Sequence, residues 1–395
     1  MPRTHLFLAV AVTLAALASP SPAMADTTAP SHAPVPVYFG TYTREGGSRG
    51  IYTCDLDPTT GRLANLRLAA ETPSPSFLAV HPTGRFVYAV NETTAFAGEK
   101  GTGGVTAFAR DPDTGLLREL NHQPTAGGNP CFVALDRDAR CVLVANYSGG
   151  NVAAFPFQPD GSLAPATTIA SLDDLAAPSA PAPPDAPRLS RAHSIQPDPT
   201  NTLAVITDLG RDHVLLAPLD PAAGTLDLAR AAVTTTAPKS GPRHLAFHPT
   251  GRFAYVIHEH ASTVTAFAFD PDARTLRPLQ TLSTLPPGFD GKNTTAEVRV
   301  HPNGRLLFGS NRGHNSIAAF AIDPDTGQLQ PLGHTPSGGR TPRHFNLDPT
   351  GRFLLVAHQD EGGVTCFALD PDTGKLTPTA RLDLAMPVCV QFVTP

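Results

Sequence analysis

The stretch that decides the fold is residues 240–260, SGPRHLAFHPTGRFAYVIHEH, because its centre, HPTGRF, recurs in identical form at residues 81–86. Related turns continue along the chain, and successive copies start roughly 50 residues apart, a period typical of repeat architectures. This first turn has six copies: HPTGRF at 81, DRDARC at 136, DPTNTL at 198, HPTGRF at 248, HPNGRL at 301 and DPTGRF at 348. The chain is therefore predicted to be a repeat protein.

A second turn recurs out of phase with the first and has seven copies: DPTTGRL at 57, DPDTGLL at 111, QPDGSL at 158, DPAAGTL at 220, DPDARTL at 270, DPDTGQL at 323 and DPDTGKL at 370. Short runs that alternate apolar and polar residues flank every turn, as in RFVYAVN (85–91) and STVTAFAFD (262–270). Such runs between Asp/Pro/Gly turns indicate strands. Each period then holds four strands, which predicts the blades of an all-β propeller.

The mismatch of seven turns against six predicts how the ring closes. The first strand, within VPVYFGTYT (35–43), is the second strand of a blade, and the last, within MPVCVQFV (386–393), is a first strand with no partner after it. Pairing these two leaves no open sheet edge. We therefore expect one domain, residues 37–395, folded as a single seven-bladed β-propeller of four-stranded blades, with the first blade closed by the C-terminal strand.

The N-terminus has the pattern of a secretory signal. Arg3 precedes an apolar run from Leu6 to about Ala18, and Ala23-Met24-Ala25 has the small-x-small form of a cleavage site. The run is short for a membrane span. We predict a signal peptide at residues 1–25, a disordered segment at 26–36, and a mature protein that is periplasmic or secreted and not bound to a membrane.

Composition excludes some functions. A net charge of −5 gives no reason to expect a nucleic-acid partner. The five cysteines are Cys54, Cys131, Cys141, Cys366 and Cys389. Most lie inside strand-like runs, without metal-ligand spacing, and are expected to act as small hydrophobic residues rather than metal ligands. The chain has no tryptophan, unlike WD40 scaffolds and the propellers that dock quinone cofactors.

Alignment of the copies on the first turn shows where they differ. The first and second strands of a blade are antiparallel, so the start of one and the end of the other share a face. Five residues before the turn (the −5 position) stand Ser76, Cys131, His193, Arg243, Ala296 and Arg343. Four before it (−4) stand Phe77, Phe132, Ser194, His244, Glu297 and His344. Eleven after its first residue (+11) stand Glu92, Tyr147, Leu209, Glu259, Arg312 and Gln359.

A polar, variable ring on a uniform framework indicates a small-molecule site at the mouth of the central channel. Arg243 and Glu259 belong to one blade and should lie close enough to pair, either as part of the site or as a structural ion pair. Glu297 has two candidate partners, Arg299 and Arg312. By contrast, His81, His248 and His301 are expected to be turn residues, and Asn146, Asp208 and Asp212 to hold loops.

The chemistry of this ring differs from that of nucleophilic hydrolases. No GxSxG elbow or P-loop occurs in the chain. Water activated by His or Glu, with arginines stabilising an oxyanion and an anionic substrate, fits the residues better.

A set of motifs carries a resemblance to a known family: FGTYT, GGNPCFVALD, VANYSGGNV, TDLGRD, GPRH, SNRG and TPRHF. From Val37 to Val393 the chain resembles the seven-bladed propeller lactonases, the group of bacterial 6-phosphogluconolactonases and fungal carboxymuconate cycloisomerases. The resemblance implies chemistry at a lactone ring, without a required metal or cofactor. It places the catalytic residues at His193, Arg243, Glu259 and Arg312.

Two departures from the family pattern are visible. Arg191 stands where the first residue of a His-x-His pair is expected, two residues before His193. The Pro/Ala-rich segment 177–187 is inserted in a loop on the predicted site face and could rim the pocket.

These observations lead to one leading function and two alternatives. We expect a 6-phosphogluconolactonase-like lactonase that hydrolyses a sugar 1,5-lactone to its aldonic acid, as a monomer or weak homodimer. The alternatives are a carboxymuconate-type cycloisomerase and a non-catalytic binding module. Beyond the four catalytic residues, the expected substrate-binding residues are Glu92, Tyr147, His244, Glu297, Arg343, His344 and Gln359.

Overall fold

The computed structural model describes residues 1–2, 33–175 and 189–394. The predicted signal peptide (1–25), most of the predicted segment 26–36 and the insertion 177–187 lie outside these residues. Within the described part, no helix is long and apolar enough to cross a membrane.

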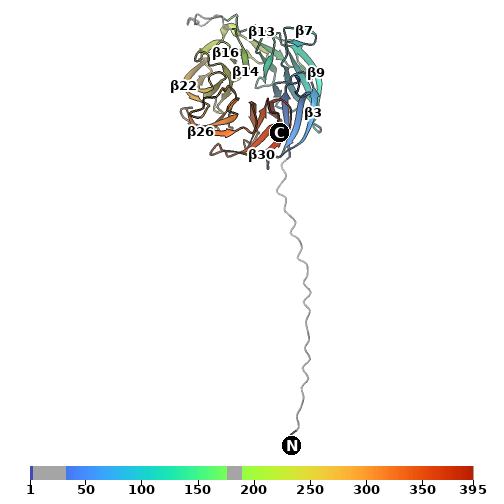
Figure 1. The fold of residues 1–395 in the computed structure, drawn as a ribbon. Helices are drawn as coiled ribbons and strands as arrows, with labels where there is room; N and C mark the ends of the chain where they lie inside the picture. The colour runs from blue at the N-terminus through green and yellow to red at the C-terminus, as the bar shows by residue number, and fades with distance from the viewer. Residues whose placement is uncertain (3–32, 176–188, 395) are drawn as a thin grey trace. The chain divides into compact units, whose positions relative to one another are not determined.

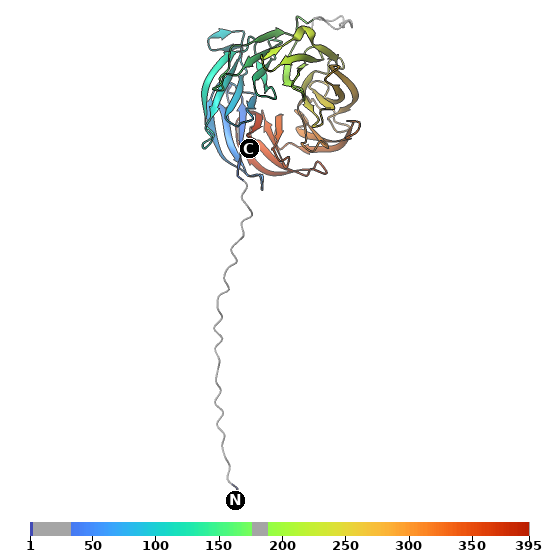
Figure 2. The same ribbon diagram turned by 180° about the vertical axis from the view of Figure 1, so that it is seen from behind.

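The described residues from 33 to 394 form a ring of seven β-sheets, as predicted (Figures 1 and 2). The innermost strands are β31 (Pro387–Phe392), β4 (Leu78–Val80), β10 (Pro130–Leu135), β14 (Ala192–Pro197), β19 (Pro242–Phe247), β23 (Thr295–Val300) and β27 (Pro342–Leu347). The second strands are β1 (Val35–Thr41), β5 (Phe86–Asn91), β11 (Cys141–Asn146), β15 (Leu203–Asp208), β20 (Phe253–His258), β24 (Leu306–Asn311) and β28 (Phe353–His358).

The third strands are β2 (Gly50–Leu56), β8 (Gly104–Arg110), β12 (Asn151–Pro156), β16 (His213–Asp220), β21 (Thr263–Asp270), β25 (Ser316–Ile322) and β29 (Val364–Leu369). The outer strands are β3 (Leu63–Glu71), β9 (Leu117–Pro124), β13 (Thr168–Ser171), β18 (Ala232–Thr235), β22 (Thr275–Ser283), β26 (Leu329–Pro336) and β30 (Leu376–Leu382). Smaller elements are β6 (Ala95–Phe96), β7 (Glu99–Lys100), β17 (Thr225–Leu226) and a 3₁₀ turn, η1 (Leu228–Arg230).

Burial follows the position of each strand in its blade. The second strands β11, β15, β20, β24 and β28 are buried along their whole length. They lie between two strands of their own blade and between neighbouring blades. The outer strands alternate, with β22 and β26 exposing most of their residues. All five cysteines are buried and free, in agreement with their expected role as small hydrophobic residues.

The ring closes as expected from the unequal numbers of turns. The C-terminal strand β31 pairs with β1 in the order β3-β2-β1-β31, with Phe39 opposite Val390. Strand β1 begins at Val35, which pairs with Leu56, so the propeller starts two residues before the expected boundary at residue 37.

The first turn is built by its own side chains. Its fourth residue has φ between 51° and 74° in all six copies (Gly84, Ala139, Asn201, Gly251, Gly304 and Gly351), the left-handed region that favours Gly or Asn. Its first residue, His or Asp, accepts a hydrogen bond from the backbone two residues on: Thr250 N–H to His248 Nδ1 at 3.2 Å, and Thr350 N–H to Asp348 Oδ2 at 3.0 Å. The repeat therefore marks a hairpin that every blade needs.

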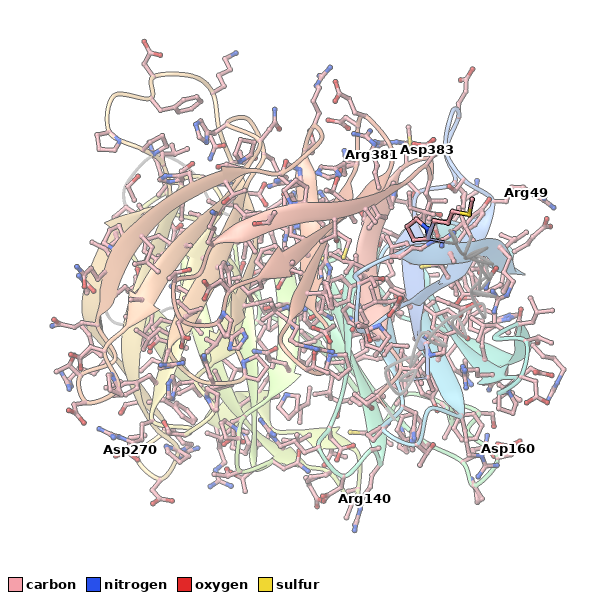
Figure 3. All side chains as sticks on the ribbon, turned by 90° about the horizontal axis from the view of Figure 1, so that it is seen from below. Arg49, Arg140, Asp160, Asp270, Arg381 and Asp383 are labelled. Atoms are coloured by element: carbon pink, nitrogen blue, oxygen red, sulfur yellow. The ribbon has the colours of Figure 1, made fainter. Side chains whose placement is uncertain are left out.

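The two faces of the propeller carry different connections (Figure 3). Arg140 and Asp270, from hairpin turns within blades, lie together with Asp160 at one face. Arg49 and the pair Arg381 and Asp383 lie at the other, where the loops between second and third strands and between blades emerge. The predicted site residues belong to this second face.

Candidate active site

A β-bulge at the start of the inner strands places the site side chains. In β19, Pro242 pairs with His258 and His244 pairs with Ile257, which leaves Arg243 as the extra residue. The same bulge occurs in three other inner strands, where the extra, unpaired residue is Cys131, His193 or Arg343. A regular strand points neighbours to opposite faces, whereas a bulge re-aims one of them. The bulge thus allows both the −5 and the −4 residue to face the channel.

A repeated hydrogen bond fixes the residue that follows each second strand. The backbone N–H of Glu259 donates to Gly241 O at 2.7 Å, and that of Arg312 donates to Thr294 O at 2.7 Å. Glu92, Tyr147, Leu209 and Gln359 are held in the same way by Ser74, Asn129, Arg191 and Thr341. Tyr42 occupies the equivalent place in the first blade, and its N–H donates to Met386 O at 3.1 Å.

The −4 residues close the channel. Phe77 stacks on Phe132 with ring centroids 4.3 Å apart, and Phe77 meets His344 edge-on at 5.2 Å. His244 packs edge-on against Phe132 at 5.1 Å. We call this group, with Glu297, the channel plug. His244, Glu297 and His344 are at most 3% exposed, so the plug is closed to solvent.

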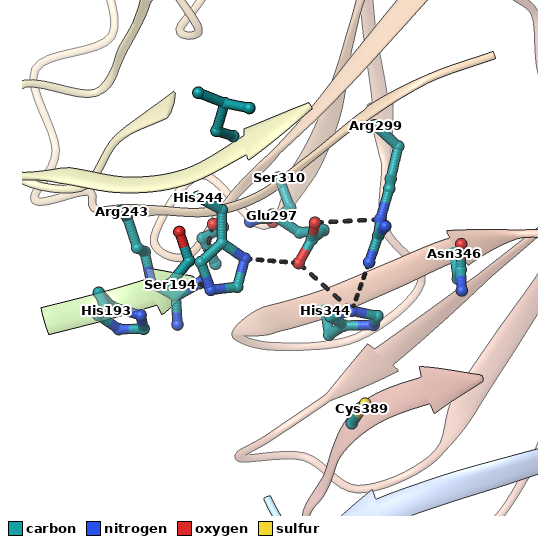
Figure 4. Close-up of polar contacts among 12 residues, drawn as sticks. His193, Ser194, Arg243, His244, Glu297, Arg299, Ser310, His344, Asn346 and Cys389 are labelled. Carbon is teal, nitrogen blue, oxygen red and sulfur yellow. Dashed lines mark hydrogen bonds and ion pairs between the residues drawn. The ribbon is translucent and has the colours of Figure 1, made fainter. Parts of the chain in front are cut away.

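One carboxylate organises the polar half of the plug (Figure 4). Glu297 Oε2 lies 2.8 Å from His244 Nδ1 and 3.3 Å from His344 Nε2, and its Oε1 lies 3.1 Å from Arg299 Nε. Val390 N–H donates to His344 Nδ1 at 3.2 Å, and His344 Nε2 also lies 3.2 Å from Arg299 Nη2, so His344 is held from three sides. Glu297 therefore pairs with Arg299, one of its two predicted partners, and not with Arg312.

The predicted Arg243–Glu259 pair is confirmed. Glu259 Oε2 lies 2.9 Å from both Arg243 Nε and Arg312 Nη2, and 4.0 Å from His193 Nε2. Burial opposes ionisation, but Arg312 and Arg243 together lower the pKa of Glu259 to about 2. Glu259 is thus a carboxylate throughout the neutral range, and its Oε1 makes no hydrogen bond to a described residue.

Arg243 links this ion pair to the plug. Its Nη1 donates to Ala296 O at 2.9 Å and lies 3.2 Å from His244 Nε2. His244 Nδ1 faces Glu297, so neutral His244 carries its proton there and accepts from Arg243 at Nε2. Arg243 Nη2 has no hydrogen bond to the described residues, and Arg243 borders a narrow cavity.

His193 is buried between these groups. Its Nδ1 lies 3.7 Å from Cys131 Sγ, and its ring meets Tyr147 and His244 edge-on. Burial, followed by the nearby charge of Arg243, lowers the pKa of His193 well below its usual value. His193 is therefore neutral at physiological pH and can accept a proton.

A cavity of about 280 Å³ opens above the plug. Its lining combines −5 residues, +11 residues and two residues from the first blade: Tyr42, Arg44, Glu92, Cys131, Tyr147, His193, Glu259, Arg343 and Gln359. Five of the predicted residues do not line it: Arg243, His244, Glu297, Arg312 and His344. Arg312 instead supports Glu259 from behind and donates to Thr295 O at 2.8 Å.

Tyr42 is a cavity residue that the sequence reasoning missed. Its hydroxyl donates to Glu92, with distances of 3.0 and 3.1 Å to the two carboxylate oxygens. The alignment relied on the first turn, and the first blade has no such turn because its first two strands come from opposite ends of the chain. Alignment on the end of the second strand, within FGTYT, would have found it.

The remaining polar residues have structural roles. Asp208 Oδ1 accepts from the N–H groups of Arg191 and Gly210, and Asp212 accepts from Lys239 and Gly241, so both hold loops as expected. Asn146 Nδ2 donates to Thr125 O. Among the described residues, no three His, Cys, Asp or Glu side chains are grouped to hold a metal ion.

The fold and the site together define a class, a seven-bladed β-propeller with a cavity lined by charged side chains at one face. The profile described as "Lactonase, 7-bladed beta-propeller" matches residues 36–392, and the chain belongs to this lactonase family. It is accordingly a lactone hydrolase similar to 6-phosphogluconolactonases, rather than a non-catalytic module.

Individual relatives agree with this assignment. A 6-phosphogluconolactonase of Bacillus subtilis is 34% identical over 309 residues, which are 78% of this chain and 83% of the relative. The structure of the periplasmic gluconolactonase of Pseudomonas aeruginosa is 34% identical, covers 91% of this chain and 99% of its own, and has a TM-score of 0.82. A Bacteroides uniformis structure is 36% identical, with 92% and 100% coverage and a TM-score of 0.81.

Proposed function

We propose that this lactonase hydrolyses a sugar 1,5-lactone to its aldonic acid in the periplasm or outside the cell. The observation that carries the proposal is that His193 and Glu259 line one cavity, while Arg243, ion-paired with Glu259, borders the narrow cavity next to it. A neutral imidazole, a permanent carboxylate and a guanidinium with a free amino group are suited to water-driven opening of an ester.

In the proposed reaction, His193 takes a proton from a water molecule that attacks the lactone carbonyl carbon. The carboxylate of Glu259, 4.0 Å from His193 Nε2, stabilises the imidazolium that forms. Arg243 Nη2 donates to the carbonyl oxygen as it becomes negative. The bond between the carbonyl carbon and the ring oxygen then breaks, His193 returns the proton to the ring oxygen, and the product is an open-chain hydroxy acid.

Two further features support the location and the substrate class. The sequence begins with the pattern of a secretory signal, and a relative of similar length from Pseudomonas aeruginosa is a periplasmic gluconolactonase. A sugar lactone formed outside the cytoplasm would reach an exported enzyme without crossing the inner membrane. We propose that the enzyme needs no cofactor and works as a monomer or weak homodimer.

The test is acid release at constant pH from glucono-1,5-lactone, with spontaneous hydrolysis subtracted. Loss of the proton acceptor in His193→Gln should lower kcat about 10²–10⁴-fold, the range for general bases. Glu259→Gln should also lower kcat, since the imidazolium loses its counter-charge. Arg140→Gln, on the opposite face and 57% exposed in its side chain, is the control and should keep full activity.

The outcome that contradicts the proposal is a folded wild-type protein with no rate above background on any sugar lactone. The same assay with a cis,cis-muconate tests the alternative cycloisomerase activity. Turnover of the muconate without lactone hydrolysis would replace the proposed function.

A further inference from the structure

Arg343 has a free guanidinium at the cavity wall. It is the bulge residue of β27, and it lines both the cavity of about 280 Å³ and the narrow cavity beside Arg243. No hydrogen bond or ion pair joins it to another described residue, and its recorded contact is with the ring of Tyr42, 5.5 Å from Cζ to the ring centroid. A guanidinium carries five N–H donors and no acceptor, so this one is available to a ligand.

Glu92 lies on the same wall and is a hydrogen-bond acceptor, whereas Arg343 is a donor. It lines the same two cavities as Arg343, and the Tyr42 hydroxyl donates to its two oxygens at 3.0 and 3.1 Å. It is not within 4.0 Å of an Arg343 nitrogen, although both groups border one space. The wall therefore offers an acceptor-only group and a donor-only group that do not satisfy each other.

A hydroxyl group is the ligand that fits both. It donates to a carboxylate and accepts from a guanidinium, so adjacent hydroxyls of a sugar can bridge Glu92 and Arg343. Glu92 and Arg343 line the same cavities as the group formed by His193, Glu259 and Arg243. They would hold the ring substituents of the lactone while that group acts on its carbonyl.

A phosphate ester is a poorer ligand for this wall. A phosphate monoester carries nearly two negative charges at neutral pH and would face the carboxylates of Glu92 and Glu259. Glu259 already occupies Arg243 and Arg312 through ion pairs at 2.9 Å. The positive charge of Arg343 is partly balanced by the nearby charge of Glu92. The remaining cation of the lining, Arg44, is exposed, so salt screens its charge.

We propose that Glu92 and Arg343 form a hydroxyl-recognition subsite that selects uncharged polyhydroxy lactones over their phosphate esters. The inference rests on the proposed lactonase function and deepens it by naming the specificity-determining residues. Tyr42 is the positioning residue, because its hydroxyl and ring hold Glu92 and Arg343 respectively.

The experiment compares kcat/KM for glucono-1,5-lactone and its 6-phosphate. The wild-type protein should prefer the free lactone at least tenfold. Glu92→Gln keeps the shape and removes the charge, so kcat/KM for the free lactone should fall about tenfold while the preference for it shrinks by about tenfold or more. Arg343→Met should weaken both substrates, and Arg343→Lys should recover part of the loss. Thermal unfolding of each variant checks that it is folded.

Direct binding separates recognition from catalysis. Calorimetric titration with gluconate and 6-phosphogluconate should show tighter binding of gluconate to the wild-type protein and a reduced difference in Glu92→Gln. A preference for the phosphorylated ligands, or an unchanged preference in folded Glu92→Gln, would overturn the subsite. Selective binding without lactone hydrolysis would overturn the proposed function and leave the subsite standing.

Discussion

At the scale of single residues, the site depends on charges that are balanced within a buried space. Glu259 offsets Arg243 and Arg312, and Glu297 offsets Arg299 while it accepts from His244. A buried ion pair contributes little net stability, but removal of one partner leaves an uncompensated charge. These carboxylates are thus better understood as holding the geometry of the arginines than as a source of stability.

Glu297 gives a prediction at this scale, because it touches no part of the cavity. Glu297→Gln puts a neutral amide where His244 needs an acceptor and Arg299 needs a counter-charge, so His244 and then Arg243 should lose their fixed orientation. We expect kcat to fall about 10–100-fold, with KM changed less, as for other residues that orient catalytic groups. The measurements are kcat, KM and the midpoint of thermal unfolding. A lower midpoint with an unchanged kcat would contradict the prediction. Glu297→Asp should recover part of the activity.

At the scale of structural elements, the recurring hairpin does more than reverse the chain. His248 Nε2 donates to Gly304 O at 2.8 Å, and His301 Nε2 donates to Gly351 O at 2.9 Å, so each histidine ties its hairpin to that of the next blade. His81 has the same HPTGRF sequence but makes no such bond, and the next hairpin has Ala139 in place of the glycine. A Cβ on Gly304 would lie only 2.7 Å from His248 Nε2, so a side chain at this position keeps the histidine away from the carbonyl. Identical sequence therefore has different contacts in different neighbourhoods.

The two identical hairpins provide a matched pair of variants. His248→Ala removes a turn acceptor and leaves the buried Gly304 carbonyl without its partner, and should cost about 1–3 kcal/mol of unfolding free energy. His81→Ala removes the turn acceptor alone and should cost about 1 kcal/mol or less. Urea unfolding measures both, and kcat should stay at the wild-type value. Equal losses of stability would refute the role of the inter-blade bond.

At the scale of the whole molecule, the site exists only in the closed ring. Tyr42 comes from the first blade, Glu92 from the second, His193 from the fourth and Arg343 from the seventh, and all four line one cavity. The strand that closes the ring, β31, also supplies the backbone N–H of Val390, which donates to His344 Nδ1. Folding and assembly of the site are therefore one event.

Buried neutral histidines predict how the whole molecule responds to acid. Burial lowers the pKa of His258 to about 4 and, opposed in part by Glu297, that of His344 to about 3, from the ordinary 6.5. The unfolded chain then binds more protons than the folded one between pH 6.5 and these values, so stability declines as pH falls through that window. Each such histidine should cost up to about 1.4 kcal/mol per pH unit.

Urea unfolding at pH 7, 6, 5 and 4 measures this dependence. The free energy of unfolding should be highest at pH 7 and fall progressively toward pH 4. His258→Asn should give a shallower decline than the wild type, since one buried titrating group is removed. A free energy that stays constant from pH 7 to pH 5 would contradict the neutral, buried state of these histidines. Glu259, whose pKa falls from the ordinary 4.5 to about 2, adds to this decline only below about pH 5.

The sequence alone determined the architecture of the propeller, because the turns that define each blade are local features of the sequence. The spacing of the HPTGRF and DPDTG turns, and the excess of one turn type, determined the number of blades, their strand order and the closure by residues 387–392. The same register determined which positions meet at the channel, and the Arg243–Glu259 pair followed because both residues belong to one blade.

Only the tertiary structure decided what each of those positions does. His244, Glu297 and His344, which we predict to bind substrate, lie in the buried plug and not at the larger cavity, whereas Tyr42 was overlooked and lines that cavity. The physical reason is that the bulge at each inner strand re-aims neighbouring side chains, and that the partners of a channel residue come from other blades, far away in sequence. Spacing along one strand cannot encode that choice, which depends on how all seven blades pack around one axis.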